Sequence, residues 1–173
     1  VQRIGSFTDT ALSFSCSSGQ VCTQCAANVI TTACLQANAA APLLISFTPT
    51  MDIKGGESVT VKLPGFTLPG FTGSPSFLNS SLLFTNLQLA PVFTWRLVDD
   101  GGDVACAQFT VVEKIMAGSS MCIGIPVDVG ITLPPTGIQA NQNSLTIETN
   151  AVGGAVAPTA IAWTQPVGAM MST

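Results

Sequence analysis

Short segments in which apolar and polar residues alternate run along most of this chain, and such alternation is the pattern of half-buried β-strands. In the first segment, Val1 to Ser15, every second residue from Thr8 to Phe14 falls on one face, with Leu12 and Phe14 as its apolar members. The further strands that the pattern predicts are Leu43 to Thr48, Ser58 to Leu63, Val92 to Val98, Val104 to Lys114, Cys122 to Ile131, Leu145 to Thr149 and Thr159 to Trp163.

These eight segments, separated by turns rich in Gly, Pro and Asp, predict an all-β chain folded as an antiparallel Ig-like β-sandwich. The Cys, Trp, Cys order of antibody domains is missing, because Trp95 precedes both Cys106 and Cys122. Residues 26–41 are rich in Ala and favour a short helix, although a β-branched run interrupts them. We divide the chain into an N-terminal strand arm (1–15), a cysteine-rich segment (16–42) and the sandwich (43–173).

The chain has six cysteines and no histidine, and an even number of cysteines is typical of disulfides in an oxidising compartment. We expect Cys106 to pair with Cys122, since the two lie in successive predicted strands. A zinc site or a redox motif at Cys22 and Cys25 is the alternative, but zinc sites usually show two Cys-x-x-Cys knuckles, and redox motifs need a βαβ context. The early cysteines then pair among themselves in one of three ways: Cys16, Cys22, Cys25 and Cys34.

Only 8% of the residues are charged, so little electrostatic repulsion keeps copies of the chain apart. This composition favours self-assembly or a cover of glycans. The five basic residues are dispersed, which argues against nucleic acid as a partner. No apolar stretch approaches the 18 residues that a membrane-spanning helix needs. No signal peptide leads the sequence, so for a secreted protein we expect Val1 to follow a cleavage site.

The sequence offers little catalytic chemistry, because it has no His and no Tyr. A Ser-His-Asp or Cys-His arrangement is therefore impossible, and we expect neither an enzyme nor a cofactor. The one acidic cluster is Asp99, Asp100 and Asp103, within Asp-Asp-Gly-Gly-Asp. Asp-Gly is strong turn chemistry, so we interpret the cluster as a hairpin turn. A calcium site and a catalytic carboxylate pair are the alternatives.

The tripeptide Asn79-Ser80-Ser81 is a sequon for N-glycosylation, and it lies in a loop predicted between Thr67 and Ser81. An acceptor asparagine in such a loop should be exposed. We therefore expect a glycan on Asn79 in a secreted eukaryotic protein.

Three stretches resemble a module found in secreted proteins of algae and other protists: Ile45 to Pro49, Gly56 to Phe66 with its Leu-Pro-Gly-Phe element, and Gly130 to Gly137. The resemblance covers Leu43 to Gly168 and implies a β-sandwich. In outline the chain is also similar to Ig-like protomers of extracellular fibrils, in which an N-terminal strand of one copy completes the sheet of another. For this chain the resemblance implies that Val1 to Ser15 is the donor strand, with Ile4, Leu12 and Phe14 as its contacts.

We therefore expect a structural subunit of an extracellular filament or surface appendage, with copies of itself as partners. The alternative for Val1 to Ser15 is an ordinary first strand of its own sheet. The alternative function is a secreted adhesion or glycan-binding module, in which loops such as Thr67 to Ser81 contact a glycan or a protein.

Overall fold

The computed structural model describes residues 4–14, 37–67, 76–77, 93–99, 104–125 and 129–168, with backbone alone for 76–77 and 93–99. Their named elements are all strands. Ten strands are described: β1 (Phe7–Phe14), β2 (Leu43–Pro49), β3 (Ser58–Leu63), β4 (Ser76–Phe77), β5 (Phe93–Asp99), β6 (Ala105–Val111), β7 (Met121–Ile125), β8 (Thr146–Thr149), β9 (Val156–Ala160) and β10 (Trp163–Thr164).

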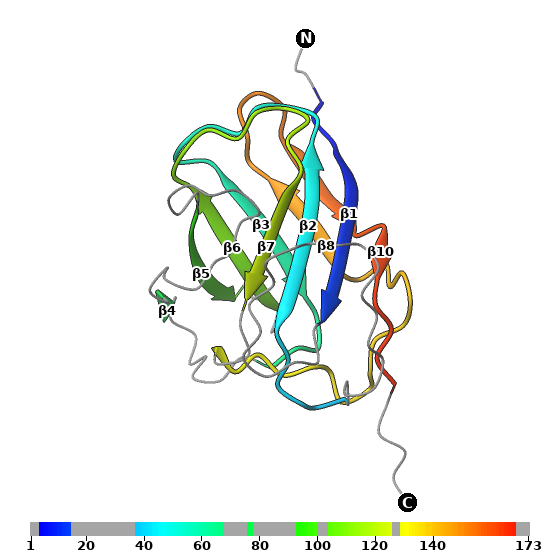
Figure 1. The fold of residues 1–173 in the computed structure, drawn as a ribbon. Helices are drawn as coiled ribbons and strands as arrows, with labels where there is room; N and C mark the ends of the chain where they lie inside the picture. The colour runs from blue at the N-terminus through cyan, green and yellow to red at the C-terminus, as the bar shows by residue number, and fades with distance from the viewer. Residues whose placement is uncertain are drawn as a thin grey trace, which may run out of the picture.

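The strands form two sheets that lie one behind the other (Figure 1). The four-stranded sheet has the order β10-β1-β2-β7, and the six-stranded sheet has the order β4-β5-β6-β3-β8-β9. Every pairing is antiparallel except that of β1 with β10, which is parallel. The chain passes from one sheet to the other between β2 and β3, between β6 and β7, between β7 and β8, and between β9 and β10.

One hydrophobic core lies between the two sheets, and the alternation along each strand supplies it. In β2, Leu43, Ile45 and Phe47 are buried, whereas the residues between them are half-exposed. The six-stranded sheet contributes facing residues such as Val61 and Phe109 to the same core cluster. Because side chains alternate across a strand, the sequence pattern alone places these apolar residues on the inner faces.

The Leu-Pro-Gly-Phe element ends β3 with a tight turn. The Phe66 amide donates a hydrogen bond to the Leu63 carbonyl oxygen at 3.3 Å. Gly65 has a φ of 81°, a left-handed conformation that glycine adopts without the Cβ penalty of other residues. A turn with proline second and glycine third has this geometry. It brings Phe66 back into the core, where its ring stacks on Phe14 with ring centroids 6.3 Å apart.

The part of the chain that the structure describes confirms the predicted all-β class, and β3 has the predicted bounds. Other elements differ from the predictions. The strand expected from Cys122 to Ile131 begins at Met121 and ends at Ile125, and residues 129–131 are not in a strand. Pro126, which follows Ile125 in the sequence, has no N–H for a ladder. The segment expected from Thr159 to Trp163 is divided between β9 and β10, which belong to different sheets. Of the predicted helix, only residues 37–41 are described, and they form a turn and a bridge.

Candidate functional site

The arm predicted to be a donor strand lies, in the single chain, inside its own four-stranded sheet. As β1 it pairs with β2 on one side and with β10 on the other. Leu12 and Phe14 are buried in the core, as the alternation predicts for their side chains. Ile4, the third predicted contact, is 93% exposed and therefore lies outside this core. The strand thus fills an interior position in the sheet, with two of its three predicted contact residues buried.

The C-terminal part of the chain holds the second side of β1 through three hydrogen bonds. The Phe14 amide donates to Oε1 of Gln165 at 2.9 Å, and the Gln165 amide donates to the Leu12 carbonyl oxygen at 2.9 Å. Nearer the start of β1, the Ala162 amide donates to Oγ1 of Thr10 at 2.8 Å. Gln165 is buried, so its side chain is a specific partner of the β1 backbone rather than a solvated amide.

The first half of β1 departs from regular alternation. Its register with β2 shifts between Thr8 and Ala11, and Asp9 has a φ of 52°. A bulge of this kind adds one residue to the strand, so the side chains that precede it lie on the opposite face from the one that alternation predicts. Thr8, which the sequence places on the same face as Leu12, is accordingly exposed. The buried face of β1 therefore begins at Thr10.

The expected disulfide between Cys106 and Cys122 is wrong, because the two side chains face away from each other. Ile123 and Ile125 point into the core, so Cys122 lies on the outer face of the four-stranded sheet. Ala105 and Ala107 likewise point into the core, so Cys106 lies on the outer face of the six-stranded sheet. Packed sheets are about 10 Å apart, and a disulfide needs Cα atoms within about 7 Å.

The environments of Cys106 and Cys122 differ from each other. Cys122 is disulfide-bonded. The Cys106 sulfur is buried and donates a hydrogen bond to the carbonyl oxygen of Val104 at 3.6 Å. The predicted pairing of the early cysteines lies outside the described residues, which include none of Cys16, Cys22, Cys25 and Cys34.

Two further predicted sites lie wholly or largely outside the described residues. Asn79, the expected glycan acceptor, is one of them. Asp99 is described as the last residue of β5, whereas the other two aspartates of its cluster, Asp100 and Asp103, are not described. Within the described ranges, no three His, Cys, Asp or Glu residues gather closely enough to hold a metal ion. The same ranges contain no helix with the length and apolar character needed to cross a membrane.

A second candidate site lies where β1 begins and where β2, β6 and β8 end (Figure 1). We call this end the loop pole and define it as residues 4–6, 50–57, 112–120 and 150–155. Its segments are bonded to one another: the Thr50 amide donates to the Ser6 carbonyl oxygen at 3.0 Å, and Ile53 and Ile115 exchange two backbone hydrogen bonds of 2.9 and 2.8 Å. Gly5 packs so closely on Gly154 that a Cβ there would lie 2.2 Å from the Gly154 carbonyl oxygen.

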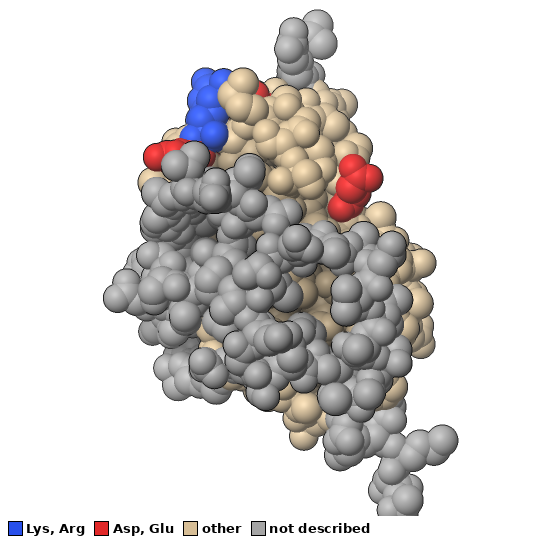
Figure 2. Space-filling model, in the orientation of Figure 1, with Lys and Arg blue, Asp and Glu red and all other residues tan. Residues whose placement is uncertain are grey.

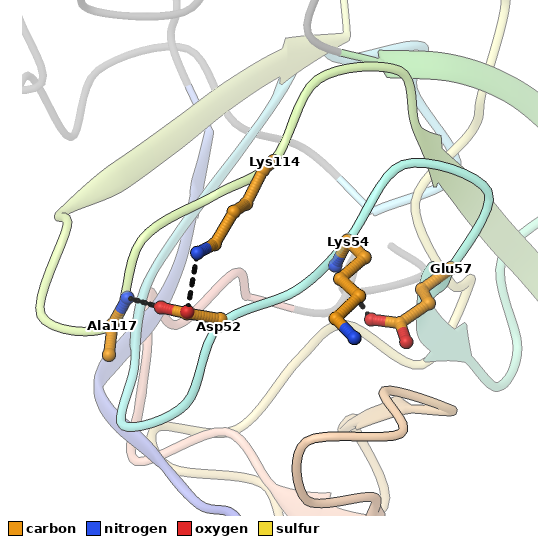
Figure 3. Close-up of polar contacts among 5 residues, drawn as sticks. All are labelled: Asp52, Lys54, Glu57, Lys114 and Ala117. Carbon is orange, nitrogen blue, oxygen red and sulfur yellow. Dashed lines mark hydrogen bonds and ion pairs between the residues drawn. The ribbon is translucent and has the colours of Figure 1, made fainter.

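Two carboxylates connect the loops of the pole, and Figure 3 shows the contacts of Asp52 and the bond of Glu57 to Lys54. Glu57 accepts hydrogen bonds from the Lys54 amide at 2.7 Å and from the Val152 amide at 2.9 Å, and so joins residues 50–57 to residues 150–155. Asp52 accepts from the Ala117 amide at 2.9 Å and forms an ion pair of 2.6 Å with Lys114. The hydrogen bond from Lys114 and, after it, the bond from Ala117 hold the pKa of Asp52 below its usual range.

The lowered pKa of Asp52 predicts a pH-dependent contribution to stability. The carboxylate is favoured in the folded state, so its contribution is present above the ordinary Asp pKa of about 3.9 and is lost as the pH falls through the lower folded value. Asp52→Asn should therefore lower the melting temperature slightly at pH 7, and the difference from the wild-type chain should vanish under strongly acidic conditions. Glu113→Gln, which removes an exposed carboxylate nearby, is the control. If the difference in melting temperature between Asp52→Asn and the wild-type chain persisted unchanged at low pH, it would contradict the role of the Asp52 charge.

Sequence reasoning did not single out Gln165, Asp52 or Glu57. The partners of Gln165 and Asp52 lie far away in the sequence, and no motif marks them. Glu57 follows Gly55-Gly56, which is a turn signal, but no motif specifies its bond to Val152.

Comparison with known proteins does not place the chain in a group. No protein-family model matches it, and no curated protein or solved structure matches it significantly.

Proposed function

We propose that this protein is a structural subunit of an extracellular filament or surface appendage, and that copies assemble by inserting β1 into one another's four-stranded sheets. The observation that carries the proposal is the position of β1. It is an interior strand that buries Leu12 and Phe14, yet the covalent connection from it to β2 is long and comprises residues 15–42. A strand of this kind is the element that exchanges between copies when a chain is domain-swapped.

Exchange would preserve the contacts that hold β1. Its bonds to Gln165 and Ala162 link residues that are 151 and 152 positions apart in the sequence. The β1 of a neighbouring copy would offer the same backbone groups and the same Leu12 and Phe14 side chains to the same partners. The change in contact free energy on exchange is therefore small, and assembly depends on concentration and on further contacts between subunits.

The strand order supports an Ig-like interpretation of the two sheets. If β1, β2 and β7 are taken as strands A, B and E, the four-stranded sheet contains the A-B-E neighbours of an immunoglobulin sandwich. The neighbours β9-β8-β3-β6 then take the places of G-F-C-C′ in the other sheet. We therefore propose an Ig-like sandwich whose strand A is the exchanged element.

Composition supports an extracellular and structural role. Cys122 is disulfide-bonded, and disulfides persist in oxidising compartments. The low charge favours association, and the lack of His and Tyr removes common catalytic groups. The loop predicted for the alternative adhesion function, Thr67 to Ser81, is described only at Thr67, Ser76 and Phe77.

Locking β1 into its own sheet should abolish filament formation. Ser13 and Leu44 are directly opposite each other on β1 and β2, and both are half-exposed. In the variant Ser13→Cys with Leu44→Cys, oxidised as a dilute monomer before assembly, a new disulfide would tie β1 to its own chain, since directly paired strand residues lie within disulfide reach. A monomeric mass without reduction would show that the bond lies within one chain. We expect electron micrographs of the oxidised variant to show separate particles where the wild-type chain forms filaments.

The single variants Ser13→Cys and Leu44→Cys are the matched controls, and both should assemble as the wild-type chain does. Peptide mapping must show the new bond and an unchanged bond at Cys122. Filaments that grow equally well from the locked chain would refute exchange of β1. If the wild-type chain forms no filament and binds glycans, the adhesion function is favoured instead.

A further inference from the structure

Exposed apolar side chains are concentrated at the loop pole. Of the five large apolar residues that are exposed in the described part of the chain, four belong to the pole: Ile4 at 93%, Val152 at 84%, Met116 at 56% and Val112 at 51%. They come from three segments of the pole: Ile4 from residues 4–6, Val152 from residues 150–155, and Val112 and Met116 from residues 112–120. Single exposed apolar residues are common on protein surfaces, so it is the grouping of four at one end that makes the pole a candidate interaction site.

Charged residues gather at the same end of an otherwise weakly charged molecule. Five of the fourteen charged residues of the chain belong to the pole, and they include both signs: Asp52, Glu57 and Glu113 with Lys54 and Lys114. In the space-filling view, the basic side chains in sight lie at this end, with acidic side chains beside them (Figure 2). Apolar residues bordered by charges of both signs are a common composition for a protein interface.

The pole is also held in one conformation before any partner arrives. Glu57 and Asp52 fix three loops to one another, and the Gly118 amide adds a bond of 2.7 Å to the Pro49 carbonyl oxygen. Loops that are already ordered lose little conformational entropy on docking, which leaves more of the contact free energy for binding.

We propose that the loop pole is a docking surface for the loop pole of a second copy of this chain. Lys114 is already paired with Asp52 in its own copy, but the pole also carries Lys54 with Glu57 and Glu113. In a two-fold contact, Lys54 of each copy can therefore face an acidic residue of the other, which makes the pole complementary to itself. The apolar residues then meet at the centre of the contact. The inference rests on the proposed self-assembly, to which it adds a second kind of contact.

The pole would stay accessible in an assembly built by exchange of β1. β1 starts at the pole and ends at Phe14, at the opposite end of the sheet, and the connection to β2 leaves from that opposite end (Figure 1). The connections between exchanged neighbours therefore lie near the ends away from the poles, and the pole of each subunit then includes residues 4–6 of the strand that it receives. Pole-to-pole contacts would link such chains to one another.

Sedimentation of the locked chain, Ser13→Cys with Leu44→Cys, tests this surface without strand exchange. We expect a monomer–dimer equilibrium that depends on concentration. Val152→Asp with Met116→Asp should weaken the dimer at least tenfold, because it places two charges where apolar side chains meet. Ala160→Asp, which adds a charge at an exposed position of β9 outside the pole, should leave the dimer unchanged. Ile4→Asp, at the most exposed of the four apolar residues, should act as the double variant does and is a further check on folding effects.

A locked chain that stays monomeric at hundreds of micromolar, or a pole variant that dimerises as strongly as the control, would overturn the inference. Loss of the dimer in Ala160→Asp as well would also overturn it, since the effect would not belong to the pole. The outcome is separate from the test of β1 exchange, because the locked chain can lose its filaments and still form pole-to-pole dimers.

Discussion

Replacing Leu12 with Ala should lower the free energy of unfolding by about 3–5 kcal/mol, which is the range for a fully buried leucine whose cavity cannot collapse. Leu12 has no exposed surface, and it lies in the same core cluster as Ile45 of β2, its partner in the β1–β2 register. Urea denaturation of the monomer, followed by intrinsic fluorescence, would measure the loss.

The matched control is Ile4→Ala, which removes a large apolar side chain from the same arm at an exposed position. Its free energy of unfolding should differ from that of the wild-type chain by less than about 0.5 kcal/mol. A Leu12→Ala chain as stable as the control would contradict the burial of β1 in the core. Leu12→Asp should prevent folding altogether, because the core would enclose an unpaired charge, so this variant cannot separate assembly from stability.

The alternation of apolar and polar residues predicted the strands well because each of the two sheets buries only one of its faces. In β3 the apolar residues alternate without interruption, and in β2 they do so from Ile45 onward; both strands lie within one residue of their predicted bounds. The same alternation in β1 predicted which of its side chains are buried from Leu12 onward. The pattern could not reveal the bulge at Asp9, because Thr8 and Thr10 fit either face equally well.

The predicted disulfide between Cys106 and Cys122 was wrong because it assumed that successive strands are neighbours and did not consider which face of each strand carries the cysteine. Cys122 precedes Ile123 and Ile125 in a strand whose isoleucines share one face, so its own side chain belongs to the other face. Ala105 and Ala107 flank Cys106 in the same manner. The phase therefore already indicated that both cysteines point outward. What it could not show is that β6 and β7 lie in different sheets, because that depends on how the chain crosses between them.

The polar contacts of the candidate sites could be predicted least. Lys114 and Asp52 form an ion pair because residues 112–120 and 50–57 lie side by side. Neither segment has a sequence motif that would predict this contact. The hydrogen bonds that Ala162 and Gln165 make with β1, which we call the clasp, require that β10 lie parallel to this N-terminal strand. β10 has only two residues and follows a change of sheet after β9, so it is too short for an alternating pattern to reveal it.

The clasp makes Gln165→Leu the most informative polar substitution. The leucine would fill nearly the same volume but could not accept the hydrogen bond from the Phe14 amide. A buried N–H left without an acceptor costs about 1–3 kcal/mol, and we expect the free energy of unfolding to fall by this amount. Gln139→Leu, the same change at an exposed glutamine, is the control and should have little effect.

Hydrogen exchange would assign the effect of Gln165→Leu to β1 rather than to a general loss of stability. Exchange at the Phe14 amide should accelerate more than exchange at interior amides of β3 and β6, which lie in the other sheet. Equal acceleration everywhere, or none at Phe14, would contradict the clasp. Since the Gln165 side chain would hold a donated β1 as it holds the chain's own, the variant should weaken both states alike. Filament yield should therefore fall with monomer stability, and no new balance between folded-back and exchanged strands should develop.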